Sequence, residues 1–213
     1  MSSKVSFPDL HDQLAERLAL SGVAPVRLVG SQEAYWQLVD ATDYRLDYYQ
    51  GEIIASMSYE SEDHSEIASN LNFLLQAIYA DRSLYRLFNS NRPVCIPACD
   101  HAVFNPDGCV ALRHAEQYQY QAGMTAELSP VLLLEILSPS TRVRDWGEKL
   151  PCYKQIPSLD YILYLESTEA RVTLMERVPA SGQWLETTFT DLTDLMLVAG
   201  QAVSLRAIYQ GVF

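Results

Sequence analysis

Residues 131–137, VLLLEIL, form an apolar run that carries a single carboxylate, Glu135. In an extended strand the even-numbered residues of this run point to one face and the odd-numbered residues, Glu135 among them, point to the other. Both faces are otherwise apolar, which is typical of a strand covered on both sides. A buried charge costs several kcal/mol unless an opposite charge or a cation meets it. The run therefore predicts a central strand and a cationic partner for Glu135.

The length of 213 residues and the composition, 48% hydrophobic and 20% charged, indicate one globular domain. We expect a helical arm at residues 1–30 and a single domain at 31–213. The longest apolar run is far shorter than the ~20 residues of a membrane span, so no membrane association is expected. The first residues have no apolar core typical of a secretion signal, which makes the cytoplasm the expected location.

The net charge of −12 argues against a general nucleic-acid binder, because non-specific affinity for nucleic acid comes from Lys and Arg at phosphates. A local basic cleft stays open. Arg142, Arg144, Lys149 and Lys154 make residues 142–154 richer in positive charge than the rest of the chain.

The four cysteines allow two interpretations. Cys95, Cys99 and Cys109, with His101 between them, have the residue types of a zinc site but lack its paired C-x2-C or H-x3-H spacing. Reduced thiols, Cys152 included, are the expected state in a cytoplasmic protein.

The order of predicted elements indicates an α/β or α+β fold with a mixed sheet. Ser31 is a typical helix N-cap, Gln50-Gly51 is a hairpin turn, and Asp63 with Glu66 is spaced as a capping box. Residues 23–30 and 114–130 are expected to be loops. The expected helices span 9–20, 32–38, 62–80 and 144–157, and the expected strands span 44–49, 52–58, 85–96, 104–112, 131–137, 160–166, 171–178 and 183–190.

Two cations could meet Glu135. A divalent metal ion needs a second hard oxygen ligand, and Asp107 offers one if strands 104–112 and 131–137 lie side by side. Lys149, on the following helix, could instead fold back over the strand end. A structural ion pair with Arg142 is the alternative without function. Two carboxylates, a metal ion and a lysine are the minimum equipment for metal-assisted phosphodiester cleavage.

The segments NPDGCV (105–110) and LLLEILSPSTRVRDWGEKLPCYKQIPSLDYILYL (132–165) resemble the Uma-type restriction-endonuclease family, a branch of the PD-(D/E)xK nuclease superfamily. In that family a Pro-Asp precedes a strand ending in Glu-x-x-Ser-Pro-Ser, and an Asp, a Lys and a Tyr follow on a helix. Asp145, Lys149 and Tyr153 stand at these three places. The family's upstream Gly-Glu strand and the His that opens its long helix match Glu52 and His64.

The resemblance implies a restriction-endonuclease-like core, a mixed β-sheet flanked by helices, with Mg²⁺ or Mn²⁺ bound by Asp107 and Glu135. The superfamily places its lysine two residues after the Glu, where this chain has Leu137, and Lys149 fills that role from the helix. Three departures are Gly108, where an apolar strand residue usually stands, Pro151, two residues past Lys149, and the long polar loop at 114–130.

The expected catalytic residues are thus Asp107, Glu135 and Lys149, the first two as metal ligands. Glu52 and His64 are supporting candidates, against their simpler interpretation as exposed residues at element ends. Tyr153 is expected to pack beside Lys149, one helical turn away. Asp145 is expected to be a helix cap rather than a ligand.

Three functions follow from these residues. The first is a metal-dependent endonuclease that hydrolyses phosphodiester bonds in DNA, acting through a local basic cleft and as a possible homodimer, since double-strand cleavage needs two centres. The second is a catalytically silent nuclease-fold module for binding or regulation. The third is a zinc-stabilised interaction protein built on the cysteines.

Overall fold

The computed structural model describes residues 7–22, 24–56, 60–90, 92–139 and 141–213. The predicted segment 52–58 extends beyond this part of the chain at residues 57 and 58, and Ser140 also lies outside it. The helices are α1 (Phe7–Ser21), α2 (Gln32–Ala41), α3 (Glu62–Ile78), α4 (Arg142–Arg144), α5 (Leu150–Tyr153) and α6 (Leu205–Ile208), with a 3₁₀ turn η1 (Pro97–Cys99) and a π-helical turn η2 (Asp145–Lys149).

The strands form two large sheets and one hairpin. The seven-stranded sheet has the order β1 (Val26–Val29), β3 (Glu52–Ser56), β2 (Arg45–Tyr49), β6 (Ala102–Phe104), β5 (Val94–Ile96), β9 (Met124–Glu127), β8 (Gln117–Gln121). The six-stranded sheet has the order β13 (Trp184–Phe189), β12 (Val172–Arg177), β11 (Tyr161–Glu166), β10 (Pro130–Leu137), β7 (Gly108–Leu112), β4 (Tyr85–Asn89). The hairpin is β14 (Leu195–Val198) with β15 (Gln201–Ser204).

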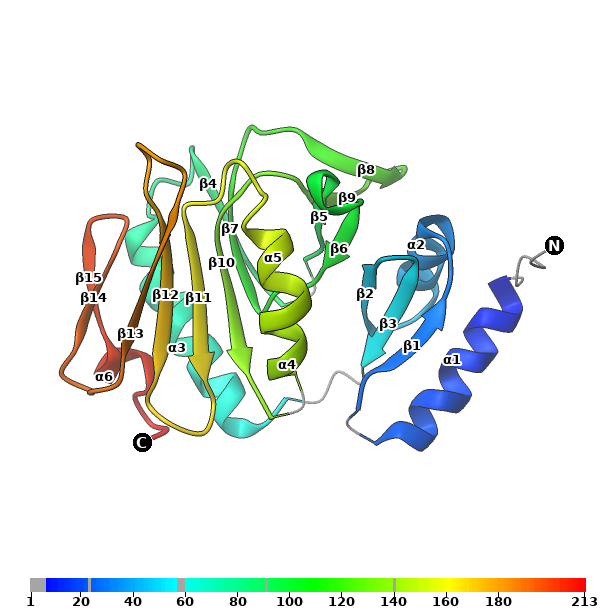
Figure 1. Ribbon diagram of the computed structural model, residues 1–213, viewed down its shortest axis with the longest axis horizontal. Coiled ribbons are helices and arrows are strands. Elements are labelled where there is room, and N and C mark those ends of the chain that lie inside the picture. The colour runs from blue at the N-terminus through cyan, green and yellow to red at the C-terminus, as the bar shows by residue number, and fades with distance from the viewer. Residues whose placement is uncertain (1–6, 23, 57–59, 91, 140) are drawn as a thin grey trace.

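Both large sheets are mixed. In the six-stranded sheet β10 runs parallel to β11 and antiparallel to β7, and in the seven-stranded sheet β5 runs parallel to β9 among antiparallel pairs. With helices packed on the sheets (Figure 1), the predicted mixed α/β architecture is confirmed.

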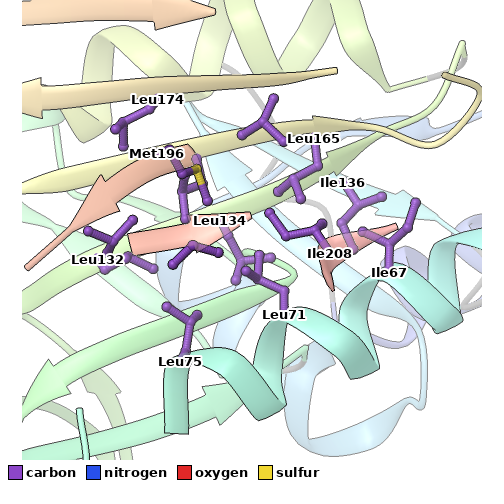
Figure 2. Close-up of a cluster of buried hydrophobic side chains, with 14 of the residues drawn as sticks. Ile67, Leu71, Leu75, Leu132, Leu134, Ile136, Leu165, Leu174, Met196 and Ile208 are labelled. Carbon is purple, nitrogen blue, oxygen red and sulfur yellow. The ribbon is translucent and has the colours of Figure 1, made fainter. Parts of the chain in front are cut away.

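Strand β10 lies between β7 and β11, and all eight of its residues are buried. Leu132, Leu134 and Ile136 pack against helix α3 on one face of the sheet (Figure 2). Leu133 and Leu137 point to the other face, which the α4–η2–α5 segment covers (Figure 1). The predicted two-sided burial of this strand is confirmed, and it leaves Glu135 on the face beneath α5.

Helix α3 forms as its apolar periodicity predicts, with Ile67, Leu71 and Leu75 buried against the sheet. Its start differs from the expected capping box. The Ser61 side chain accepts a hydrogen bond from the backbone N–H of His64 and is the N-cap, so Asp63 is a residue of the first turn rather than the cap, and both Asp63 and Glu66 are exposed.

The predicted strand 104–112 is divided between the two sheets. β6 ends at Phe104 in one sheet, and β7 begins at Gly108 in the other. Pro106 lies in the connection, where its missing N–H prevents it from continuing a central ladder. The predicted strand 85–96 is divided in the same way into β4 and β5. Asp107 therefore lies at a crossing from one sheet to the other.

The helical segment after β10 begins at Arg142, not at Asp145, so the predicted role of Asp145 as a cap is wrong. Its middle turn is π-helical, with the Leu150 N–H bonded to the Asp145 carbonyl. Pro151 follows directly, and a proline removes one N–H from the regular helical ladder. The helical segment therefore contains a widened turn directly before Pro151, and this turn carries Lys149.

Several elements were not predicted. Residues 26–29, expected to be a loop, form β1. The 114–130 loop contains the hairpin β8–β9, and β14, β15 and α6 close the chain. Leu10, Leu14 and Leu18 of α1 pack in a core cluster with residues of β1, β3 and α2, and the boundary at residue 30 between an arm and a domain stays a prediction. Among the described residues, no helix is long and apolar enough to cross a membrane.

The cysteines differ from both expectations. Cys99 of η1 and Cys152 of α5 form a disulfide, while Cys95 and Cys109 are buried free thiols. The expectation of four reduced thiols is therefore wrong for the first pair. Because the disulfide uses Cys99, it also removes a ligand from the predicted zinc site.

Candidate active site

Asp107 is fixed against the strand that carries Glu135. Its backbone N–H donates to the carbonyl of Leu134 over 3.1 Å, and its Oδ2 accepts from the backbone N–H of Ile136 over 2.6 Å. These two bonds lie on either side of Glu135. The register Gly108↔Leu134, continued by one residue, places Asp107 opposite Glu135. As predicted, β7 and β10 lie side by side, and this pairing brings Asp107 close to Glu135.

Glu135 is 1% exposed, and two side chains meet its Oε1. The ammonium of Lys149 donates to this oxygen over 2.8 Å, and the hydroxyl of Tyr153 donates to it over 2.6 Å. The alternative of an ion pair with Arg142 is wrong, because Arg142 pairs with Glu166.

Lys149 lies on the π-helical turn and is 3% exposed. Its ammonium also forms an ion pair with Asp145, 2.9 Å away and one turn earlier on the same helical segment. Asp145 is therefore a buried partner of the lysine. Tyr153 packs one turn further along, as predicted, and its hydroxyl reaches the same carboxylate.

Two arginines that the sequence analysis did not select complete the cluster. Arg45, the first residue of β2, donates to Asp107 Oδ1 over 2.7 Å and also to the carbonyl of Asn105. Arg144 donates to Asp47 on β2. We use "the charge cluster" for these seven residues: Arg45, Asp47, Asp107, Glu135, Arg144, Asp145 and Lys149.

The charge cluster holds four carboxylates and three permanent cations, all largely buried. Buried carboxylates are stable only when their charge is balanced. Among these seven residues the carboxylates outnumber the permanent cations by one, and His64, beside Asp107, adds a further positive charge when it is protonated.

The pKa values of the two facing acids are moved in opposite directions. Burial raises the pKa of Glu135 to about 7; Lys149 opposes this shift, while the charges of Asp145 and Asp107 add to it. Burial would also raise the pKa of Asp107, but Arg45 and His64 outweigh it and hold the pKa of Asp107 well below its usual value. At neutral pH one acid is firmly ionised and its neighbour is close to its titration point.

His64 lies in the first turn of α3, close to Asp107. Its Nε2 is 3.6 Å from Asp107 Oδ1 and 3.9 Å from Glu60 Oε1. The ligand atoms of Glu60, His64 and Asp107 all lie within 4.8 Å of one another, an arrangement that could hold a metal ion. The three residues line a cavity of about 240 Å³ between α3 and the β4 and β7 end of the sheet.

Glu52 stands apart from the other predicted residues. Its carboxylate pairs with Arg27 of β1, which also pairs with Glu148 of the π-helical turn. Through Glu148 the ion pairs continue to Arg144. Glu52 therefore links β3 to the helical segment that carries Lys149 and is not a neighbour of Asp107.

Gly108 is explained by close packing. A Cβ at this position would lie 2.6 Å from Leu134 Cδ2, so an apolar side chain could stand here only if Leu134 moved. The glycine lets Asp107 approach β10 closely enough to bond to Ile136.

The residues present fit a divalent cation bound by Asp107 and Glu135. The donor set is a pair of carboxylates, Glu135 on β10 and Asp107 directly before β7, and carboxylate ligands suit Mg²⁺ or Mn²⁺. Burial, opposed by Lys149, raises the pKa of Glu135, so a cation bound beside this carboxylate would favour its ionised form.

The basic residues 142–154 are mostly neutralised. Arg142 pairs with Glu166, Arg144 with Asp47, and Lys149 with Glu135 and Asp145. These arginines and this lysine therefore stabilise the helical segment, and the local basic cleft that would bind DNA stays a prediction.

Comparisons with known proteins place this geometry in a family. Residues 32–207 match the family described as "Uma2: Putative restriction endonuclease". Two uncharacterized Synechocystis proteins are related to the chain. One, sll1609, is 30% identical over 175 residues, covering 82% of this chain and 91% of its own length. The other, slr1290, is 27% identical over 183 residues, covering 85% and 92%.

The fold is also similar to a crystal structure from Anabaena variabilis, described as "a putative nuclease belonging to DUF820". The similarity has a TM-score of 0.61 at 17% sequence identity and covers 77% of this chain and 89% of that one. The family match spans most of the chain, the two curated relatives match over nearly their whole length, and the architecture agrees. The chain belongs to the Uma2 family.

Proposed function

We propose that this protein is a metal-dependent endonuclease that hydrolyses phosphodiester bonds in DNA. The observation that carries the proposal is the meeting of Asp107, Glu135 and Lys149, from three separate segments, within one buried cluster. The family description and the fold of the Anabaena variabilis protein support the same class of activity.

Asp107 and Glu135 would hold Mg²⁺ or Mn²⁺ between the two strands. When bound, such a cation polarises the phosphate and lowers the pKa of a coordinated water. Asp107 needs no proton loss to act as a ligand, since its pKa is already held low by Arg45. The pKa of Glu135 is about 7, so a large part of this carboxyl is ionised at neutral pH and able to act as a ligand.

Lys149 has two tasks in this proposal. Its ammonium holds Glu135 through the 2.8 Å bond, with Tyr153 fixing the same oxygen from the other side. Its positive charge, kept by Asp145 and Glu135 against the effect of burial, also stabilises negative charge that develops on the phosphate.

Arg45 lies between Asp107 and a second cavity. Its guanidinium pairs with Asp107, and the residue lines a cavity of about 600 Å³ together with Arg92 and Tyr120. A cation bound to Asp107 would compete with this ion pair. A guanidinium released in this way can bind a phosphate through two parallel hydrogen bonds, so Arg45 would contact the DNA backbone.

A second candidate function, a catalytically silent binding or regulatory module, is favoured by the same Arg45–Asp107 pair. If the guanidinium is a permanent partner of Asp107, it takes the place of the metal ion. The net charge of −12 also favours this alternative, because it weakens attraction to DNA.

Cleavage of supercoiled plasmid DNA tests the proposal. We expect wild-type protein to nick the plasmid with Mg²⁺ or Mn²⁺ and to lose the activity in EDTA. Asp107→Asn, Glu135→Gln and Lys149→Met should each lower the rate by about 100-fold or more. Glu186→Gln, the same change of charge at an exposed position of β13, is the matched control.

Wild-type protein that binds the cation but never nicks DNA would contradict the proposal. The silent module would then be supported if Arg45→Ala, which removes the competing guanidinium, is also inactive. Equal cleavage by wild type and by the Asp107 and Glu135 variants would assign the activity to a contaminant.

A further inference from the structure

The Nε2 atom of His64 is buried, and the described residues offer it no hydrogen-bond partner. Its two nearest acceptors are Asp107 Oδ1 at 3.6 Å and Glu60 Oε1 at 3.9 Å. Hydrogen bonds from a nitrogen to an oxygen span about 2.7–3.2 Å. A buried polar atom without a partner is unfavourable by about 1–3 kcal/mol. A ligand that binds His64 Nε2 would remove this cost.

The spacing of the three side chains fits a shared cation. Zn²⁺ binds imidazole nitrogen at about 2.0–2.1 Å and carboxylate oxygen at about 2.0–2.2 Å, so two tetrahedral ligands lie about 3.4 Å apart. The separations of 3.6 and 3.9 Å are close to this value, and all three ligand atoms lie within 4.8 Å of one another.

The local structure holds the three ligands from two separate segments. Ser61 caps α3 through the N–H of His64, and this cap brings Glu60, just before the helix, next to His64 in its first turn. Asp107 comes from the crossing between the two sheets. The cavity of about 240 Å³ that they line has room for the water molecule that would complete a tetrahedral site.

We propose that Glu60, His64 and Asp107 form a second cation site, which takes a transition-metal ion of the Zn²⁺ class in preference to Mg²⁺. One imidazole and two carboxylates favour Zn²⁺, whereas Mg²⁺ prefers oxygen ligands and water. The site shares Asp107 with the magnesium site proposed above. Asp107 Oδ1 accepts from Arg45, so a cation at this second site, like one at the magnesium site, would compete with that ion pair.

The new site would add a second positive charge beside the phosphate. Two cations about 3.5–4 Å apart stabilise both the attacking and the leaving oxygen in many phosphodiester-cleaving enzymes. The inference deepens the proposed function in this respect, but binding of Zn²⁺ at His64 can be measured without any cleavage.

The test is calorimetric titration of the metal-stripped full chain with Zn²⁺ and, separately, with Mg²⁺. We expect one Zn²⁺ to bind to the wild type. His64→Asn should weaken the binding by at least about 100-fold, because even an outer-shell partner of a metal site contributes about 10–100-fold. Glu60→Gln should weaken it less, since Glu60 is exposed and a water can replace it.

Two matched controls carry the same changes outside the site. His114→Asn and Glu62→Gln alter an exposed histidine and an exposed acid and should bind Zn²⁺ as the wild type does. Far-ultraviolet circular dichroism shows whether each variant is folded. Anomalous diffraction at the zinc edge gives a second measurement, with a peak expected within bonding distance of His64 Nε2.

Glu135→Gln separates this inference from the proposed function. It should abolish plasmid cleavage and weaken Mg²⁺ binding, yet keep Zn²⁺ binding that depends on His64. Zn²⁺ binding by His64→Asn equal to that of the wild type, or an anomalous peak elsewhere, would overturn the inference. Zn²⁺ bound at His64 in a protein that never cleaves DNA would instead support the second cation site and contradict the proposed nuclease function.

Discussion

The ammonium of Lys149 lies 2.8 Å from Glu135, although fourteen residues separate them in the chain. The two are brought together because the segment after β10 folds back over the sheet as a short helix with a π-helical turn. A charge that is unfavourable within an apolar strand is thereby met by an opposite charge from the helix above it. This pair anchors the charge cluster.

Removing Lys149 should destabilise the fold strongly. Lys149→Met leaves two buried acids, Glu135 and Asp145, without their shared cation, and breaking a buried pair costs about 3–5 kcal/mol. Urea denaturation of the wild type, Lys149→Met, Glu135→Gln and the double variant gives the coupling energy. The double variant should be less destabilised than the sum of the single changes. Simple additivity would mean that the pair does not act as a unit.

Glu135 should make the stability of the metal-free protein fall as the pH rises from about 4.5 to about 7. Its pKa is 4.5 in an ordinary setting and about 7 in the folded chain. Between these values the folded state keeps a proton that the unfolded state has lost, so a higher pH favours unfolding. The full effect is about 3 kcal/mol.

This dependence can be isolated with Glu135→Gln, which does not titrate. The free energy of unfolding in EDTA, measured from about pH 5 to pH 8, should fall for the wild type relative to the variant. His64, whose pKa is also raised, titrates in both proteins and cancels in the comparison. Parallel curves would show that Glu135 is ionised throughout this range.

Gly108→Ala should disturb the packing that holds Asp107 against β10. Its Cβ would meet Leu134 Cδ2 at 2.6 Å, and overpacking of this kind costs about 1–3 kcal/mol. The rate of plasmid cleavage and the melting temperature should both fall. Gly147→Ala, where an added Cβ meets nothing within 4 Å, is the control. In the Gly108→Ala variant, a second substitution, Leu134→Ala, should make room for the new Cβ and return Asp107 to its original position. If Gly108→Ala alone left the activity unaltered, the close approach of Asp107 to β10 would not be needed.

The disulfide between Cys99 and Cys152 should stabilise the oxidised protein by about 4 kcal/mol, because it closes a loop of 53 residues in the unfolded chain. Thermal unfolding with and without a thiol reductant measures the effect. The reductant should lower the melting temperature of the wild type and leave the Cys99→Ser/Cys152→Ser variant unchanged. A wild type that is insensitive to the reductant would show that the bond does not form in solution.

The sequence predicts the parts of the fold that depend on local pattern. The two-sided burial of β10, the apolar stripe of α3 and the Gln50-Gly51 hairpin follow from periodicity and turn chemistry. The division of 104–112 between two sheets does not, although Asn-Pro-Asp-Gly at 105–108 is a typical turn sequence. Such a sequence predicts a break in the strand, but it does not show that the chain changes from one sheet to the other.

The sequence predicted some residues of the candidate site and missed others. Glu135 was evident as a charge in an apolar strand. Asp107 and Lys149 were proposed as its partners from their positions in the sequence, and the family resemblance supported both and added Tyr153. Asp47 could have been found by the argument used for Glu135, since it lies in a strand with buried neighbours. Arg45 and Glu60 could not, because an arginine at a strand start and an acid before a helix are ordinary surface residues until tertiary contacts bring them to Asp107.

A crystal soaked in Mn²⁺, examined by anomalous diffraction, tests the central claim most directly. The account predicts a peak between the carboxylates of Asp107 and Glu135, within about 2.0–2.3 Å of an oxygen of each, with the Arg45 guanidinium moved away from Asp107. A map in which Arg45 still holds Asp107, Lys149 alone meets Glu135, and no peak lies between the two acids would contradict it.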